Sequence, residues 1–213
     1  MTGDNKRSQV ALYIKELLSM EITSAQIKKL REKTGISVMQ CKKSLEEAEG
    51  DMEKALIILK KKRSEVADKK SERELGAGVV GSYTHNTNEV AALVNLSCET
   101  DFVSKNEEFV ALAKNIAMHV AAQNPAYISR EDLTEGALQK AKEVFSEEVK
   151  DKPKDMQEKI LEGKLNAYFK DQILLEQDFI KNPETTIGEM VTGAVQKFGE
   201  NISVVEIRRV SIK

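Results

Sequence analysis

Apolar residues in the first third of the chain recur every three or four positions, which predicts amphipathic helices. Residues 8–20 have this spacing and predict a short helix that would need a surface to pack against. Residues 22–62 predict three more helices, because capping side chains and helix-ending glycines divide the apolar pattern. These caps and stops are Ser24, Gly35, Ser37, Gly50 and Asp51. The predicted inward positions are Ile27, Leu30, Cys41, Leu45, Ala48, Met52, Ala55, Leu56 and Leu59.

Charged residues dominate positions 60–74, where few side chains could join a core. This stretch predicts a solvated helical linker and a domain boundary. We therefore expect an N-terminal extension at residues 1–21, a three-helix domain at 22–62, a charged linker at 63–75 and a core domain at 76–213.

Beyond residue 76 the pattern changes to β-like runs separated by helical stretches. Residues 79–84 and 89–97 predict a β-hairpin, and residues 202–212 predict a last strand that closes the sheet. Helices are predicted at 104–123, 133–149, 154–175 and 186–198, and the second and third form a helical hairpin broken around Pro153. The expected fold class is α+β: a three-helix domain, then a core in which helices pack on a small antiparallel sheet.

The composition gives little support to a nucleic-acid or membrane partner. The 33 basic and 35 acidic side chains leave a net charge of −2, so no broad cationic field is expected. Aromatic residues make up 5% and Trp is absent, which leaves few surfaces for base stacking. Two cysteines, Cys41 and Cys98, predict no disulfide framework and suit a reducing compartment. No apolar run approaches the roughly 20 residues that span a bilayer.

A glycine-rich run, Gly76-Ala77-Gly78-Val79-Val80-Gly81, formally fits the dinucleotide-binding fingerprint. That fingerprint needs a strand before it and a helix N-terminus after it, so that backbone amides can hold a pyrophosphate. Here a charged helix precedes the run and a strand follows it, which favours a flexible start to the hairpin. The sequence contains no Gly-x-x-x-x-Gly-Lys-Ser/Thr loop, and we expect no bound cofactor.

Cys98 and His119 are the candidate pair for thiol–imidazole catalysis. Nothing in the sequence marks an orienting third group or an oxyanion site, so Cys98 is better explained as a small, partly buried side chain. No group of His, Cys, Asp and Glu has the spacing of metal ligands. We expect neither an enzyme nor a metal site.

Residues 99–103, Glu-Thr-Asp-Phe-Val, follow a predicted strand and precede a predicted helix, so they should form an exposed corner. Two interpretations are open. Asp101 could cap the helix while Phe102 packs into the core. Alternatively, Phe102 could project beside an acidic group as an aromatic anchor, which is typical of interface hot spots.

A second candidate surface lies in the three-helix domain, around Arg31, Val38 and Met39. Val38 and Met39 could belong to the core, since the sequence does not say which apolar residues are exposed. Beside Arg31 at a helix N-terminus, they could equally contact a partner.

Five segments that occur in family order resemble the elongation factor Ts family, and together they run from about residue 22 to the end. The first is Leu30-Arg31-Glu32-Lys33-Thr34-Gly35 with Met39-Gln40-Cys41-Lys42-Lys43 and Leu45-Glu46-Glu47-Ala48-Glu49-Gly50-Asp51. The second is Cys98-Glu99-Thr100-Asp101-Phe102-Val103 with Asn106 and Phe109. The others are Ile116-Ala117-Met118-His119-Val120-Ala121-Ala122, Lys159-Ile160-Leu161-Glu162-Gly163-Lys164-Leu165 and Leu175-Glu176-Gln177-Asp178-Phe179. Five ordered matches are highly specific, although any one alone would be weak.

The resemblance implies a guanine-nucleotide exchange factor for the GTPase elongation factor Tu, with a ubiquitin-associated-like domain and an α+β dimerisation core. Asp101 and Phe102 match the family pair that enters the GTPase domain, where the Phe wedges between helices near the switch region and disturbs the magnesium and phosphate sites. His119 matches the family histidine that helps to displace the phosphate side. The implied partner-binding residues are Arg31, Val38, Met39, Thr100, Asp101, Phe102, Val103, Met118 and His119.

The chain also departs from the family pattern. Ile36-Ser37-Val38-Met39 replaces the usual Ala-Gly-Met-Met, so the contact at Val38 is smaller, and Asp178 replaces a usual Pro. Longer members duplicate the core and add a coiled-coil insertion, whereas this chain carries one core copy. The resemblance therefore implies a homodimer of cores that binds two GTPases, in a bacterial cytoplasm or an organelle matrix. The alternative is a ubiquitin-associated-type binding module without exchange activity, but Thr34-Gly35-Ile36 replaces its usual Met-Gly-Phe/Tyr loop.

Overall fold

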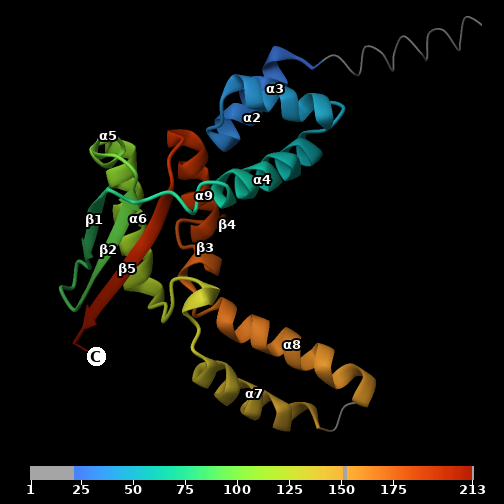
Figure 1. Ribbon diagram of the computed structural model, residues 1–213, viewed down its shortest axis with the longest axis vertical. Helices are drawn as coiled ribbons and strands as arrows, with labels where there is room; N and C mark the ends of the chain where they lie inside the picture. Colours follow the sequence, from blue (N-terminus) through green and yellow to red (C-terminus); the bar gives the residue numbers. More distant parts are fainter. Residues whose placement is uncertain (1–21, 151–152, 213) are drawn as a thin grey trace, which may run out of the picture. The chain divides into compact units, whose positions relative to one another are not determined.

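The computed structural model describes residues 22–150 and 153–212 (Figure 1). The helix predicted at residues 8–20 lies outside the described residues. The chain divides after Lys70 into two compact units. The division falls inside the range 63–75 that was expected to connect two domains.

The first unit consists of helices α2 (Ser24–Thr34), α3 (Val38–Glu47) and α4 (Met52–Asp68). Ser37 and Asp51 cap α3 and α4 as predicted, but the cap of α2 is Thr23 and not Ser24. The reason is a capping box, in which Thr23 Oγ1 accepts the Gln26 N–H and Gln26 Oε1 accepts the Thr23 N–H. Helix α4 continues to Asp68, so the first part of the charged stretch is helical.

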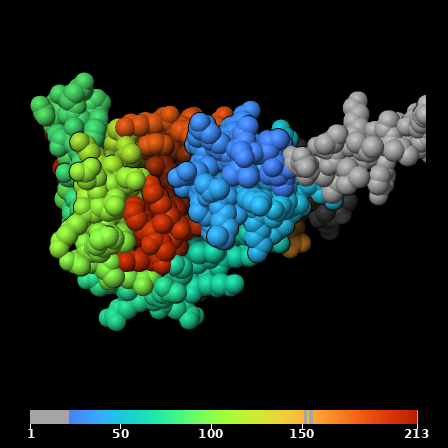
Figure 2. All heavy atoms as spheres, turned by 90° about the horizontal axis from the view of Figure 1, so that it is seen from above, coloured from blue at the N-terminus to red at the C-terminus, as the bar shows by residue number. Residues whose placement is uncertain are grey.

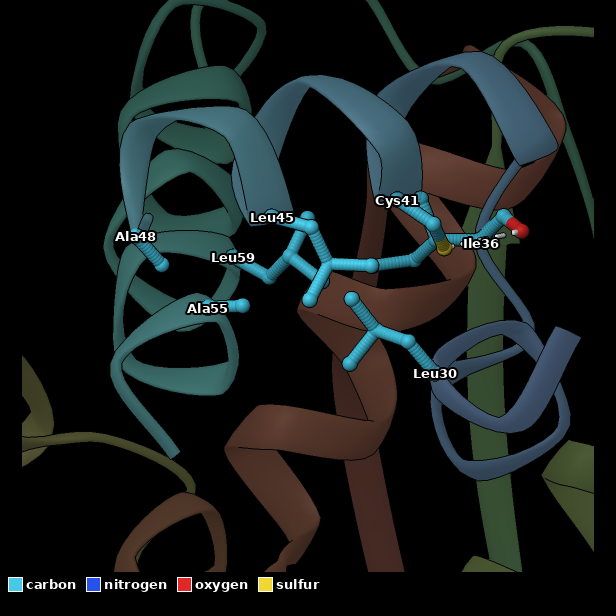
Figure 3. Close-up of a cluster of buried hydrophobic side chains, with 7 residues drawn as sticks. All are labelled: Leu30, Ile36, Cys41, Leu45, Ala48, Ala55 and Leu59. Atoms are coloured by element: carbon cyan, nitrogen blue, oxygen red, sulfur yellow. Dashed lines mark hydrogen bonds between the residues drawn. The ribbon is translucent and has the colours of Figure 1, made fainter. Parts of the chain in front are cut away.

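Side chains from all three helices point toward one another in the core of the first unit (Figure 3). Leu30, Leu45 and Leu59 contribute one buried side chain from each helix. The other buried members are Ile36, Cys41, Ala48 and Ala55, and the partly buried Ile27, Met52 and Leu56 pack against them. Helices α2 and α3, with 11 and 10 residues, are marginal alone in water, so this shared core is what stabilises them.

The second unit is built on a three-stranded antiparallel sheet with strand order β1-β2-β5. The strands are β1 (Ala77–Thr84), β2 (Val90–Cys98) and β5 (Ile202–Ser211). Helix α6 (Glu107–Gln123) lies across one face of this sheet (Figure 1). Ala92, Val94 and Leu96, at alternate positions of β2, are buried while Leu93 between them is exposed. The sheet therefore has one covered face and one open face.

Gly81 explains part of the glycine-rich run. A Cβ built on Gly81 would lie 2.4 Å from the carbonyl carbon and oxygen of Ala113 in α6, so only glycine lets β1 and α6 approach this closely. The run does begin the hairpin, as expected, but it does so as part of strand β1, which starts at Ala77 and includes Gly78 and Gly81. The run leads through a turn into β2 and not into a helix, as a dinucleotide fingerprint would require.

Helices α7 (Glu135–Val149) and α8 (Lys154–Lys170) form the predicted helical hairpin, which extends away from the sheet in Figure 1. The prediction that the second helix runs to residue 175 was wrong, since α8 ends at Lys170. The N–H groups of Leu174 and Leu175 donate to the carbonyl oxygens of Tyr127 and Ile128 at 2.9 and 3.1 Å. These tertiary hydrogen bonds replace the helical ones, and only the short 3-10 helix η2 (Leu174–Glu176) follows.

A two-residue strand, β3 (Asp178–Phe179), pairs with β4 (Asn182–Thr186) and was not predicted. Helix α9 (Ile187–Phe198) then begins at a capping box of Thr186 and Glu189 and leads to β5. Two short helices, α5 (Asp101–Ser104) and η1 (Arg130–Asp132), complete the described elements. The predicted α+β class is confirmed: N-terminal helices precede a core with a small antiparallel sheet. Within residues 22–150 and 153–212, no helix has the length and apolar character needed to cross a membrane.

Candidate partner-binding surface

Phe102 projects from the corner between β2 and α6, and 83% of its surface is exposed. It is the second residue of α5, whose next residue, Val103, is buried and anchors the turn to the core. The interpretation that Phe102 packs into the core was therefore wrong, because Val103 occupies the inward position. An exposed Phe is among the least favourable side chains to leave in water, which makes this position a candidate contact.

Asp101 lies beside Phe102 but does not cap a helix. Thr100 is the N-cap residue of α5 and Asn106 caps α6, so the capping interpretation of Asp101 was also wrong. The Asp101 carboxylate accepts a hydrogen bond from Lys105 Nζ at 2.6 Å, and this partner lowers the pKa of Asp101 below its ordinary value. Both side chains are largely exposed, so a binding partner could replace the Asp101–Lys105 ion pair with an ion pair or hydrogen bond of its own to Asp101.

Thr100 is hydrogen-bonded to Glu200, which lies 100 residues further along the chain. Its backbone N–H and its hydroxyl donate to the two carboxylate oxygens of Glu200, at 3.0 and 2.6 Å. Its carbonyl oxygen accepts the Cys98 thiol at 3.2 Å. Figure 2 shows the consequence in space, since the chain near residue 200 (red) lies directly beside the corner (light green).

The same corner is tied on its other side through Glu99. The Glu99 carboxylate accepts the backbone N–H of Asn201 at 2.5 Å and pairs with Arg73 at 3.4 Å. The buried Asn201 amide donates in turn to the carbonyl oxygens of Ser71 and Arg73. The residues on both sides of Phe102 are thus fixed although its ring is free of the core.

His119 is fully buried in α6 and makes two hydrogen bonds. Its Nε2 lies 2.9 Å from Gln177 Oε1, and its Nδ1 accepts the backbone N–H of Ile180 at 3.4 Å. Because the Gln177 amide nitrogen donates to Asp171 O, its Oε1 is the acceptor, and His119 carries its proton on Nε2. Burial lowers the pKa of His119, and the Gln177 contact opposes this only partly. The ring is therefore a neutral structural group between α6 and the β3 segment.

Met118, the neighbour of His119, is partly exposed. Of the residues that the resemblance implied, the second unit thus presents Thr100, Asp101, Phe102 and Met118 at least partly at its surface. Val103 and His119 lie inside the core, where they have no surface to offer in this structure.

The first unit presents its own apolar group at the start of α3. Met39 is 80% exposed and Val38 is 50% exposed, so the interpretation that they belong to the core was wrong. Cys41 and Leu45, further along the same helix, are buried and hold it in place. Arg31, in α2, is exposed as well.

The groups that could carry covalent chemistry are used inside the fold. The Cys98 thiol is buried and donates to Thr100 O, and burial raises its pKa, which disfavours the nucleophilic thiolate. His119 is engaged by Gln177 and Ile180 and not by this thiol. Among residues 22–150 and 153–212, no three His, Cys, Asp or Glu side chains gather where they could hold a metal ion.

Sequence reasoning missed Glu200, Asn201 and Gln177, which hold the corner and the buried histidine. Glu200 lies 100 residues from Thr100 and Gln177 lies 58 residues from His119. No local periodicity marks a polar residue whose partner is that distant. The one available signal was Gly199, a helix-ending glycine that puts the two following residues at the edge of the sheet.

An exposed aromatic ring beside a carboxylate, on a turn whose backbone is fixed by distant residues, is typical of a protein-interaction surface. The sequence model described as elongation factor Ts matches residues 19–212. A protein named elongation factor Ts from Thermodesulfovibrio yellowstonii is 48% identical over 186 residues, which cover 87% of this chain and 93% of that protein. Another from Thermosipho melanesiensis is 46% identical over 185 residues, 86% of this chain and 94% of the relative. The chain belongs to the elongation factor Ts family.

Proposed function

We propose that this chain binds the GTPase elongation factor Tu and accelerates the release of GDP from it. The observation that carries the proposal is Phe102, an exposed ring on a fixed corner beside the carboxylate of Asp101. Inserted into a partner, such a ring gains apolar burial only where the partner opens a space for it. Binding is then tighter to the opened, nucleotide-free GTPase than to the closed, GDP-bound one, and by linkage each ligand weakens the other.

One ring cannot supply the whole effect. Weakening GDP binding about ten-thousandfold requires roughly 5.5 kcal/mol of differential binding. Burying one Phe contributes roughly 1.5–3 kcal/mol. The remainder must come from a wider contact, and the exposed Val38 and Met39 of the first unit supply apolar surface for it. Arg31 adds a charge that can pair with the partner.

Within the second unit, we assign different tasks to the implied residues. Asp101, Phe102 and Met118 make contact, whereas Val103 and His119 support the contact from beneath. This role for His119 follows from its burial and from its two hydrogen bonds to the β3 side of the unit. No covalent step is needed, because exchange changes only the relative affinities of ligands.

We also infer that two copies associate through the sheet face that α6 leaves open. Val80 and Val210 on this face are 62% and 71% exposed, and Leu93 lies between them in β2. Glu206 and Arg208 occupy the same face, opposite Asn95 and Leu93 in the register. In a two-fold arrangement the patch meets itself, so charges of both signs in one patch are self-complementary. Leu93→Lys should shift the sedimentation of the chain to that of a monomer, while Val144→Lys, at an exposed valine of α7, should leave it unchanged.

The test of exchange is a stopped-flow measurement with elongation factor Tu loaded with fluorescent GDP. Adding the chain with excess unlabelled GDP should accelerate the loss of fluorescence, with a rate that rises and saturates with its concentration. Ubiquitin immobilised on a sensor provides the comparison for the alternative class. An unchanged GDP release rate together with capture by ubiquitin would favour the binding module and reject exchange.

A further inference from the structure

Glu200 occupies a three-residue junction between α9 and β5. Helix α9 ends at Phe198, and Gly199 turns the chain in the left-handed conformation with φ 77°, while its N–H donates to Val195 O. A residue with a side chain would be strained there, so the turn that delivers Glu200 is fixed by its glycine. The next residue, Asn201, is buried and begins the return into the sheet. The Glu200 carboxylate is thereby directed at Thr100 in the corner.

Helix α5 needs such support because it is only four residues long. A helix of this length has too few internal hydrogen bonds to be stable alone. Phe102 contributes almost no packing because its ring is exposed, and the pair of Asp101 and Lys105 is solvated on both sides. Val103 is the one buried side chain of α5. A single apolar anchor fixes the position of a turn poorly, since the turn can still rotate about it.

Thr100 supplies the missing constraints. Both of its donors, the N–H and the hydroxyl, go to the two oxygens of one carboxylate, and its carbonyl accepts Cys98 Sγ–H and the Ser104 N–H. The Thr100 side chain makes no cap hydrogen bond to α5, and its hydroxyl donates to Glu200. A Gln at position 200 has only one acceptor oxygen for these two donors, so the Thr100 hydroxyl would have to turn and accept from the Gln NH₂. Both hydrogen bonds would then lose the assistance of the carboxylate charge.

We propose that Glu200 is a positioning residue for nucleotide exchange, which holds Thr100 so that Asp101 and Phe102 are presented in an ordered turn before the partner arrives. This inference rests on the proposed function. Without the carboxylate, the turn is ordered only on binding, and the free energy of ordering is subtracted from the differential binding that expels GDP. Glu200 accordingly acts through Thr100, whose N–H, hydroxyl and carbonyl all make hydrogen bonds within the chain.

The first measurement compares Glu200→Gln with the parent chain in the same stopped-flow assay. We expect the maximal GDP release rate at saturating concentration to fall about fivefold, which corresponds to one charge-assisted hydrogen bond in a partly solvated site. The half-saturating concentration should change little, because the first unit and the rest of the interface are intact. Thr100→Val should reproduce the loss and Thr100→Ser, which keeps the hydroxyl, should restore most of the rate. Glu184→Gln, at an exposed carboxylate of β4, is the matched control.

A double-mutant cycle separates positioning from general stability. If Glu200 acts by ordering the turn that presents Phe102, then Glu200→Gln should cause a clearly smaller loss in a Phe102→Ala background than in the parent chain. The inference would be overturned if the losses in GDP release rate from the two substitutions were additive. It would also be overturned if Glu200→Gln released GDP as fast as an active parent chain. Either result would leave the proposed exchange function intact. An inactive wild type would instead reject the proposed function.

Amide hydrogen exchange of the chain alone tests the positioning without the partner. Glu200→Gln should speed exchange at the amides of residues 100–104 and leave those of α6 unchanged. If residues 100–104 were equally protected from hydrogen exchange in the variant and the parent, the inference would be overturned, whatever the rate of GDP release.

Discussion

The two exposed apolar groups of this molecule are held in place by different means. Met39 lies in the first turn of α3, and the same helix buries Cys41 and Leu45 in the core of the first unit. Phe102 lies in a four-residue helix that buries only Val103 and depends on hydrogen bonds that the Glu200 and Glu99 carboxylates accept from Thr100 and Asn201. A helix of three turns can fix one exposed side chain through the packing of its others. A short corner cannot, and it needs polar ties to distant residues.

This difference predicts different failures. Changes near Met39 should alter contact area without altering local structure, whereas changes near Phe102 should alter the order of the turn as well. The second unit also depends on the close backbone packing of β1 on α6 at Gly81.

The largest effect is expected for Gly81→Val, which would break the second unit and spare the first. Its Cβ would overlap the Ala113 carbonyl, so β1 and α6 must separate, and we expect a loss of more than about 3 kcal/mol of stability. Hydrogen exchange should show lost protection across β1 and α6 and unchanged protection around Leu30 and Leu45. Gly163→Ala in α8, where a Cβ meets open space, should raise stability by about 0.5–1 kcal/mol. Parent-like protection in Gly81→Val would contradict the close-packing explanation.

Phe102→Ala should have the next largest effect and should act on exchange alone. Removing the ring should lower the maximal GDP release rate by roughly ten- to a hundredfold, because about 1.5–3 kcal/mol of burial in the opened GTPase is lost. Binding to elongation factor Tu, followed by titration calorimetry, should largely persist. Since the side chain is exposed, the melting temperature should not fall. Wild-type release rates would remove the wedge role of this ring.

Met39→Ala should give a smaller loss of a different kind. We expect the half-saturating concentration to rise about fivefold, from roughly 1 kcal/mol of lost contact area, with the maximal release rate nearly unchanged. Ile57→Ala, at another exposed apolar residue of the first unit, is the matched control. A fall in the maximal GDP release rate for Met39→Ala would mean that the first unit also drives the opening of the GTPase. Met39 and Phe102 would then not differ in the step that they affect.

The smallest effect at neutral pH concerns His119. Its pKa is lowered in the folded protein, so the unfolded chain takes up a proton first as the pH falls. Stability should therefore be independent of this group well above its unfolded pKa of about 6.5 and should decrease below it. Protonated Nδ1 would also face the Ile180 N–H, donor against donor. Urea unfolding between pH 7 and pH 5 should show this decrease in the parent and in His85→Gln, at an exposed histidine, but a weaker one in His119→Gln.

The order and type of most elements could be predicted from the sequence, because caps, glycines and apolar spacing act over a few residues. Ser37, Asp51 and the β1–β2 alternation are local signals of this kind. Failures occurred where distant backbone groups compete with local preference. Helix α8 stops early because Leu174 and Leu175 bond to Tyr127 and Ile128, and β3 is too short to produce a pattern.

For the candidate site, the sequence by itself determined that residues 99–103 form a corner and that Arg31, Val38 and Met39 surround a helix start. Only the tertiary structure decided that Phe102 faces solvent and that His119 does not. The physical reason is that exposure depends on what packs against a side chain. Val103 takes the inward place at the corner, Gln177 closes over His119, and Glu200 reaches Thr100 across 100 residues of chain. Such neighbours are brought together by the fold and leave no trace in local spacing.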